Sequence, residues 1–142
     1  MGLDNPTQKM SKSETGHSHA IILLDSSDSI RQKIMGATTD SLREVRFDEN
    51  RPGINNLLVI YETFTKLSRL DIEARFEGKG YAHFKQELAE IIIEGLRPLQ
   101  SRYHQLMADP TRIDSLLAEG AAKVKPIAEK TLTIVKQKMG LI

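Results

Sequence analysis

The chain has 142 residues, the size of one ordinary domain, and its 20 basic and 19 acidic side chains leave a net charge of +1. This balance favours neither a histone-like polyanion binder nor an acidic chaperone. The absence of cysteine excludes disulfides, thiolate nucleophiles and cysteine-ligated zinc, and it suits a reducing compartment. The longest apolar run, at residues 20–24, is too short to span a bilayer, and the first residues do not resemble a secretory leader. We therefore expect a cytoplasmic protein that does not bind a membrane.

Residues 1–53 are interrupted by glycine and proline, and they are predicted to form loops with a single helix. That helix is expected to begin at a cap on Asp25 or Ser27 and to end near Gly36. The apolar run at residues 20–24 has the composition of a short strand, but an unpaired strand is not stable and no partner strand is evident.

From Ile54 onward the apolar residues recur at steps of three and four, the spacing of amphipathic helices. The stripes predict helices at about residues 54–67, 71–76, 84–106 and 113–139. The last two are long and are separated by a short turn, which favours packing as an antiparallel pair. The predicted fold class is all-α: a helical bundle with a long antiparallel helix hairpin, preceded by a loop-rich segment.

The segment Lys9-Met10-Ser11-Lys12-Ser13 has two lysines, two hydroxyls and little apolar character. Such a segment suits a polyphosphate ligand, because lysine supplies a compact positive charge and serine supplies a hydrogen-bond donor. These groups lower a barrier where negative charge develops in the transition state. A lysine-rich stretch near a chain end is also commonly a solvated tail, so composition alone leaves both interpretations open.

The order of these residues is the KMSKS signature of class I aminoacyl-tRNA synthetases. Further blocks along the whole chain resemble bacterial tryptophanyl-tRNA synthetases, in the order in which that family has them. They are residues 5–7, 45–48, 51–58, 76–81, 102–104 and 119–123. The blocks at 51–58 and 76–81 separate this resemblance from one to the related tyrosine enzymes, which share the signature.

The family joins tryptophan to ATP as an enzyme-bound adenylate and then moves the aminoacyl group to the 3′ end of tryptophan tRNA. The resemblance implies that Lys9 and Lys12 are catalytic, stabilising the triphosphate of ATP, which enters as its Mg²⁺ complex, while pyrophosphate leaves. Met10, Ser11 and Ser13 would complete the ATP contact, the methionine by packing inward and the serines through hydroxyl or backbone groups.

The second class I signature, His-Ile-Gly-His, and a nucleotide-binding sheet are both absent from the sequence. We therefore expect the chain to be the C-terminal portion of the enzyme. Residues 1–53 would be the tail of the α/β catalytic domain with the ATP loop, and residues 54–142 the helical domain that binds the tRNA anticodon. The run at residues 20–24 would lie against the missing half. Because the family's homodimer is built largely by that half, this portion should be a monomer, inactive alone and without a required cofactor.

Contacts to tRNA are less specifically indicated. Residues 112–142 carry six basic and three acidic side chains, a local excess of +3. Such a helix face can bind phosphates, but it can equally be an ordinary solvated face. Arg97, Arg102, Lys123 and Lys130 are the candidate tRNA-binding residues.

Other polar features are given structural interpretations. His17 and His19 lack further ligands at a suitable spacing, so no metal site is predicted. Lys79 lies between two glycines, where it could meet a phosphate or simply mark a turn between helices. The aromatic residues on the apolar stripes are predicted to be core; they are Tyr61, Phe64, Phe84 and Tyr103.

Two hypotheses of different classes remain. In the first, the chain is the C-terminal part of a tryptophan-tRNA ligase. In the second, it is a free-standing helical module that binds RNA or protein and has no ATP chemistry.

Overall fold

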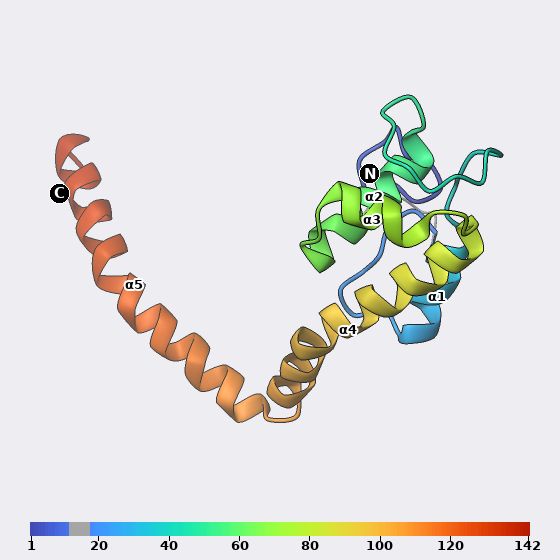
Figure 1. The fold of residues 1–142 in the computed structure, drawn as a ribbon. Helices are drawn as coiled ribbons and strands as arrows, with labels where there is room; N and C mark the ends of the chain where they lie inside the picture. The colour runs from blue at the N-terminus through green and yellow to red at the C-terminus, as the bar shows by residue number, and fades with distance from the viewer. Residues whose placement is uncertain (12–17) are drawn as a thin grey trace. The chain divides into compact units, whose positions relative to one another are not determined.

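The structure is a computed structural model that describes residues 1–11 and 18–142. These residues form helices and no β-strand (Figure 1). The helices are α1 (Ser27–Gly36), α2 (Pro52–Thr65), α3 (Arg69–Phe76), α4 (Tyr81–Met107) and α5 (Pro110–Lys138). The all-α class is therefore confirmed. No helix in the described ranges has both the length and the apolar character needed to cross a membrane.

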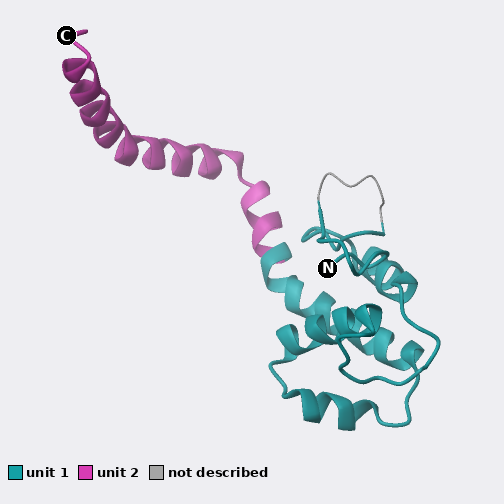
Figure 2. Ribbon diagram, turned by 90° about the horizontal axis from the view of Figure 1, so that it is seen from above, with its two compact units in different colours: residues 1–100 teal, residues 101–142 magenta. Residues whose placement is uncertain are grey.

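The chain divides into two compact units, residues 1–100 and residues 101–142 (Figure 2). The first unit contains the N-terminal segment, α1, α2, α3 and most of α4, and the second contains the end of α4 with α5. Helix α5 has no buried residue. Antiparallel packing of the two long helices, and a functional division at residue 53, both stay predictions.

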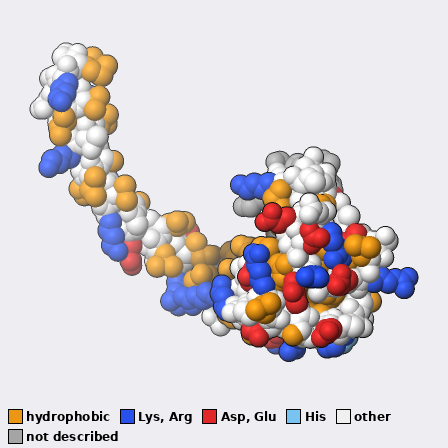
Figure 3. Space-filling model, turned by 45° about the horizontal axis from the view of Figure 1, so that its top comes forward, with side chains coloured by type: hydrophobic (Ala, Val, Ile, Leu, Met, Phe, Trp, Pro, Cys, Tyr) orange, Lys and Arg blue, Asp and Glu red, His pale blue; other side chains and the backbone are white. Residues whose placement is uncertain are grey.

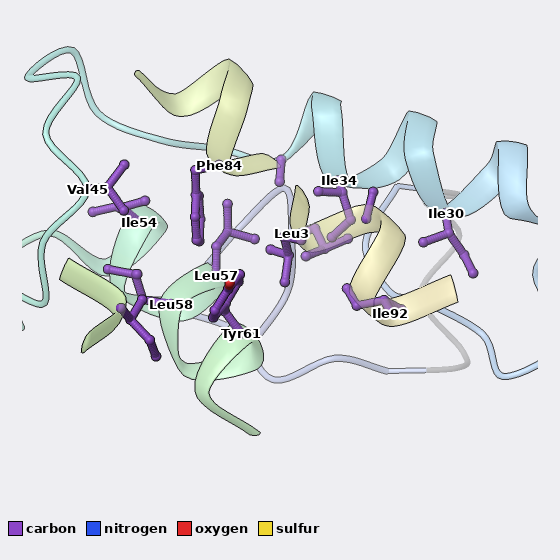
Figure 4. Packing of buried hydrophobic residues seen from close by; sticks show 14 of the residues in the cluster. Leu3, Ile30, Ile34, Val45, Ile54, Leu57, Leu58, Tyr61, Phe84 and Ile92 are labelled. Atoms are coloured by element: carbon purple, nitrogen blue, oxygen red, sulfur yellow. The ribbon is translucent and has the colours of Figure 1, made fainter. Parts of the chain in front are cut away.

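The hydrophobic core of the first unit draws on the N-terminal segment as well as on α1 to α4 (Figure 4). Leu3, Ile34, Tyr61 and Phe84 each expose 1% or less of their surface. The Phe76 ring meets the Tyr61 ring edge-on with centroids 5.4 Å apart, and it meets the Phe84 ring likewise at 5.0 Å. Each such burial contributes roughly 1.5–3 kcal/mol. Residues 1–53 and helices α2 to α4 of the first unit therefore share one core.

The start of α1 differs from the prediction in the identity of its cap. Ser26 is the N-cap, and its hydroxyl accepts a hydrogen bond from the Ser29 N–H at 3.2 Å. Asp25 cannot serve because its carboxylate is taken by the Lys33 ammonium at 2.6 Å and by the Ile22 N–H at 2.8 Å. The prediction of Asp25 or Ser27 as the cap was wrong by one residue.

The apolar run at residues 20–24 forms a turn, in which the Asp25 N–H donates to the Ile22 carbonyl at 2.9 Å. Gln100 of α4 donates its side-chain amide to the Leu23 carbonyl, also at 2.9 Å. Ile22, Leu23 and Leu24 are 44%, 55% and 45% exposed. Ala20 is buried and Ile21 packs against the core, so the run is held to the first unit while the side chains of Ile22, Leu23 and Leu24 remain accessible.

Of the four aromatic residues predicted to be core, Tyr61 and Phe84 are buried. Phe64 and Tyr103 are 38% and 39% exposed, so the prediction was wrong for them. Phe64 lies near the end of α2 with its ring against Gly95, which covers only part of it. Tyr103 belongs to the second unit, beyond the buried cluster.

Candidate functional site

The described part of the signature lies at the end of the N-terminal arm, which we define as residues 1–11. The arm folds back on itself: the Gly2 N–H donates to the Gln8 carbonyl at 2.7 Å. Met10 is partly buried and packs against the core, the inward placement expected for it. Lys9 is exposed, so its ammonium group is accessible to a ligand. Lys12 and Ser13 lie outside the described residues.

The arm is fixed to the first unit by contacts on both sides. The side-chain amide of Asn56, in α2, donates to the carbonyls of Met1 and Gly2 at 3.1 and 3.2 Å. The Thr38 N–H donates to the Leu3 carbonyl at 2.8 Å. Because Asn56 is itself buried, α2 holds the backbone that leads to the signature. The block at residues 51–58 thus supports the arm.

A polar network joins the loop after α1 to the starts of α2 and α4. Arg51 is 9% exposed and donates from Nε to Asp40 Oδ2 at 2.8 Å and from Nη2 to the Glu44 carbonyl at 2.7 Å. The Tyr81 hydroxyl donates to Asp40 Oδ1 at 2.6 Å. The Arg51 guanidinium holds the pKa of Asp40 far below its usual range. Burial and the Asp40 hydrogen bond raise the pKa of Tyr81 to about 12.

Beside this network lies a cleft of about 650 Å³. It is formed by residues 42–46 on one side and by α3 with the turn at residues 77–80 on the other. Three exposed cations line it: Arg43, Arg46 and Lys79. The lining carboxylates are Glu44, Glu73 and Glu77. Basic and acidic side chains also lie close together on the face of the first unit that Figure 3 shows.

The cleft presents both hydrogen-bond donors and acceptors. Glu73 is partly engaged, because its Oε1 accepts from the Phe47 N–H at 2.8 Å. Gly78 adopts a φ of 72°, and the following Lys79 N–H donates to the Phe76 carbonyl at 2.9 Å. Lys79 therefore marks a turn and also faces the cleft. Sequence reasoning missed the cleft, since its two sides lie about 30 residues apart in the chain.

The four residues predicted to bind tRNA are exposed, and they are divided between the two units. Arg97 lies in the first unit and is paired with Glu94. Arg102, Lys123 and Lys130 lie in the second unit. The two lysines are seven residues apart on α5, so they share a face about 10 Å apart along the axis.

A family model and several curated relatives match this chain over ranges that include the signature. The family model described as class I tRNA synthetases (W and Y) matches residues 1–97. The tryptophan-tRNA ligase of Wolinella succinogenes is 51% identical over 142 residues, a match that covers 100% of this chain and 43% of the relative. The enzyme of Bacillus subtilis is 42% identical, with 99% and 43% covered. The chain thus spans less than half the length of these relatives.

Solved structures agree. The tryptophanyl-tRNA synthetase of Mycoplasma pneumoniae superposes with a TM-score of 0.81 at 30% identity, covering 100% of this chain and 45% of that one. A Campylobacter jejuni tryptophanyl-tRNA synthetase complexed with ADP and tryptophan gives a TM-score of 0.76 at 27% identity, with 99% and 43% covered. The resemblance inferred from the signature and its flanking blocks is therefore confirmed, and the chain belongs to the class I tRNA synthetases of the W and Y family.

Proposed function

We propose that this chain is the C-terminal part of an ATP-dependent tryptophan-tRNA ligase and supplies the ATP loop and the tRNA-binding helices. In the first step a tryptophan carboxylate oxygen bonds to the α-phosphorus of ATP, and the bond from that phosphorus to pyrophosphate breaks. In the second, a hydroxyl at the 3′ end of tryptophan tRNA bonds to the acyl carbon of the adenylate, and the acyl–phosphate bond breaks to release AMP. The observation that best supports this proposal is the placement of Lys9, the first lysine of the signature. It is exposed, and it lies at the end of an arm that Asn56 of α2 holds in place.

The chemical role of Lys9 follows from this placement. Negative charge accumulates on the leaving pyrophosphate, and a positioned ammonium group stabilises it without paying reorganisation cost during the reaction. Lys12 is assigned the same role through the family's signature, and Ser11 and Ser13 further contacts to ATP. ATP enters as its Mg²⁺ complex, and this portion needs no cofactor of its own to fold.

The rest of the enzyme must supply the tryptophan pocket, the second signature and the sheet that holds the nucleotide. We propose that the intact enzyme is a cytoplasmic homodimer, and that this portion alone is monomeric and inactive. The exposed side chains of Ile22, Leu23 and Leu24 support a contact with the missing half, because a stable surface rarely leaves such a run uncovered.

For tRNA we propose the cleft between residues 42–46 and 70–80 as a contact, in addition to Arg97, Arg102, Lys123 and Lys130. Unpaired loop bases are read through their hydrogen-bonding edges, which need donors and acceptors together. The cleft offers guanidinium and ammonium donors beside carboxylate acceptors. The more purely basic positions on α5 suit phosphates, which carry no sequence information.

The experiment that tests the function is amino-acid-dependent exchange of pyrophosphate into ATP by the intact protein, followed by charging of tRNA. We expect tryptophan to support both reactions and tyrosine to support neither. If no amino acid supports exchange while the helical part still binds RNA, the chain is a binding module without ATP chemistry.

A further inference from the structure

His19 lies inside the first unit, where its ring joins the segment after the signature to the N-terminal arm. Its side chain is 2% exposed. Nδ1 lies 2.7 Å from Oδ1 of Asp4, and Nε2 lies 3.1 Å from the carbonyl oxygen of Lys9. The His19 carbonyl also accepts from the Leu3 N–H at 2.9 Å. The residue thus holds both its side chain and its backbone against the arm.

Both ring nitrogens face acceptors. A carbonyl oxygen only accepts hydrogen bonds, so Nε2–H is the donor to Lys9. The hydrogen bond from His19 is the main cause that lowers the pKa of Asp4, so the carboxyl is ionised and accepts as well. A neutral imidazole has one N–H, so its other ring nitrogen would turn a lone pair toward an acceptor oxygen, which is repulsive. The ring that satisfies both contacts is the imidazolium.

The surroundings of the ring are fitted to it. A Cβ atom on Gly2 would lie 2.4 Å from Cε1 and 2.8 Å from Nδ1 of His19, so glycine at this position is what leaves room for the imidazole. The Thr38 hydroxyl donates to the Asp4 carbonyl at 2.7 Å. Asp4 is therefore held by its backbone while its carboxylate meets the ring.

We propose that His19 is a positioning residue for the signature: its imidazolium bridges Asp4 and the Lys9 carbonyl, and so fixes the backbone from which the first signature lysine projects toward ATP. The inference rests on the proposed function, because it assigns His19 to the same reaction. His19 touches no reacting atom and acts only through Lys9. A displacement of about 1 Å at a positioned group can cost as much as 10²-fold in rate, so a bridge of this kind is measurable.

The test uses the intact protein and the variants His19→Gln, Asp4→Asn and the two combined. His83→Gln is the control, since His83 is exposed on α4. Tryptophan-dependent pyrophosphate exchange is measured over a range of ATP and tryptophan concentrations. Each rate is divided by the folded fraction of the variant, which is measured by circular dichroism.

We expect His19→Gln and Asp4→Asn each to lower kcat roughly tenfold and to raise KM for ATP, with KM for tryptophan unchanged. The double variant should be little worse than the worse single variant, because both changes break one bridge.

Normal kcat and KM for ATP in folded His19→Gln would overturn the inference. It would also be overturned if the loss of kcat in the double variant equalled the product of the losses in the two single variants. A second readout does not need activity: the ¹⁵N resonances of the His19 ring should show both nitrogens protonated at neutral pH, and Asp4→Asn should abolish that signature. A neutral ring in the wild type would overturn the bridge even in an active enzyme. If the wild type supports no exchange at all, the proposed function fails, and the ring spectrum still decides whether the bridge exists.

Discussion

Arg51 and Asp40 are joined by two hydrogen bonds, from Nε to Oδ2 at 2.8 Å and from Nη2 to Oδ1 at 3.2 Å. The pair connects the residue before α2 to the loop that follows α1, and Tyr81 at the start of α4 donates to the same carboxylate. Because Arg51 is 9% exposed, loss of the Asp40 charge leaves a largely buried cation whose remaining carboxylate partner is Glu44, 62% exposed and 3.8 Å away.

We therefore expect Asp40→Asn to lower the free energy of unfolding of this chain by about 3 kcal/mol, measured by urea denaturation. Asp28→Asn is the matched control. Asp28 also pairs with an arginine, Arg31, but its side chain is 95% exposed, so its loss should cost less than about 1 kcal/mol. Equal losses for the two variants would show that burial of Arg51 does not set the strength of the network.

The same network makes stability depend on alkaline pH. The pKa of Tyr81 is raised to about 12 in the folded protein by burial and by Asp40, against about 10 in an unfolded chain. Between these values the folded state binds more protons than the unfolded state, so stability falls as pH rises from about 10 to about 12. Tyr81→Phe should flatten that fall in urea unfolding measured across this range. An unchanged slope would mean that Tyr81 does not titrate differently in the two states.

Gly53 lies where α2 begins against the backbone of the loop after α1. A Cβ atom there would be 2.5 Å from the Thr38 carbonyl oxygen, and neither backbone can easily move. We expect Gly53→Ala to lower the unfolding free energy by roughly 1–3 kcal/mol, as overpacking does. Gly36→Ala, where a Cβ meets nothing within 4 Å, should be neutral or stabilising by about 0.5 kcal/mol in the same urea titration. An unchanged unfolding free energy in Gly53→Ala would show that position 53 does not lie this close to the Thr38 carbonyl oxygen.

Charge removal in the cleft tests its contact with tRNA. In the intact protein, Arg43→Gln combined with Lys79→Gln should weaken tryptophan tRNA binding and reduce the slope of log K against log salt by about one or two. Lys66→Gln, an exposed lysine that does not line the cleft, is the control. Filter binding over a salt series gives both quantities. An unchanged affinity would remove the cleft from the tRNA contact.

The helices could be predicted from the sequence because their apolar stripes are long. The stripe at about residues 84–106 became α4 (Tyr81–Met107), and that at about 113–139 became α5 (Pro110–Lys138). The cap of α1 could not be predicted, since Asp25 is diverted by a contact with Lys33, eight residues away. Exposure of Phe64 likewise depends on how α2 ends against α4, which periodicity does not encode.

The family could be predicted because a fixed order of residues, Lys9 to Ser13 with its flanking blocks, is far more specific than composition. The cleft and the bridge at His19 could not be predicted from the sequence, because both are made by segments that meet only in the folded chain. His19 was interpreted as half of an incomplete metal pair. Its neighbours Asp4 and Lys9 become relevant only once the arm folds back beside it.

The most direct test of the central claim is tryptophan-dependent pyrophosphate exchange by the intact protein carrying Lys9→Ala, with Lys66→Ala as the control for loss of an exposed lysine. The account predicts that Lys9→Ala lowers the exchange rate roughly 100-fold, about 3 kcal/mol of transition-state stabilisation, and that the control matches the wild type. A Lys9→Ala enzyme that is folded and as fast as the wild type would contradict the assignment of the signature to ATP chemistry.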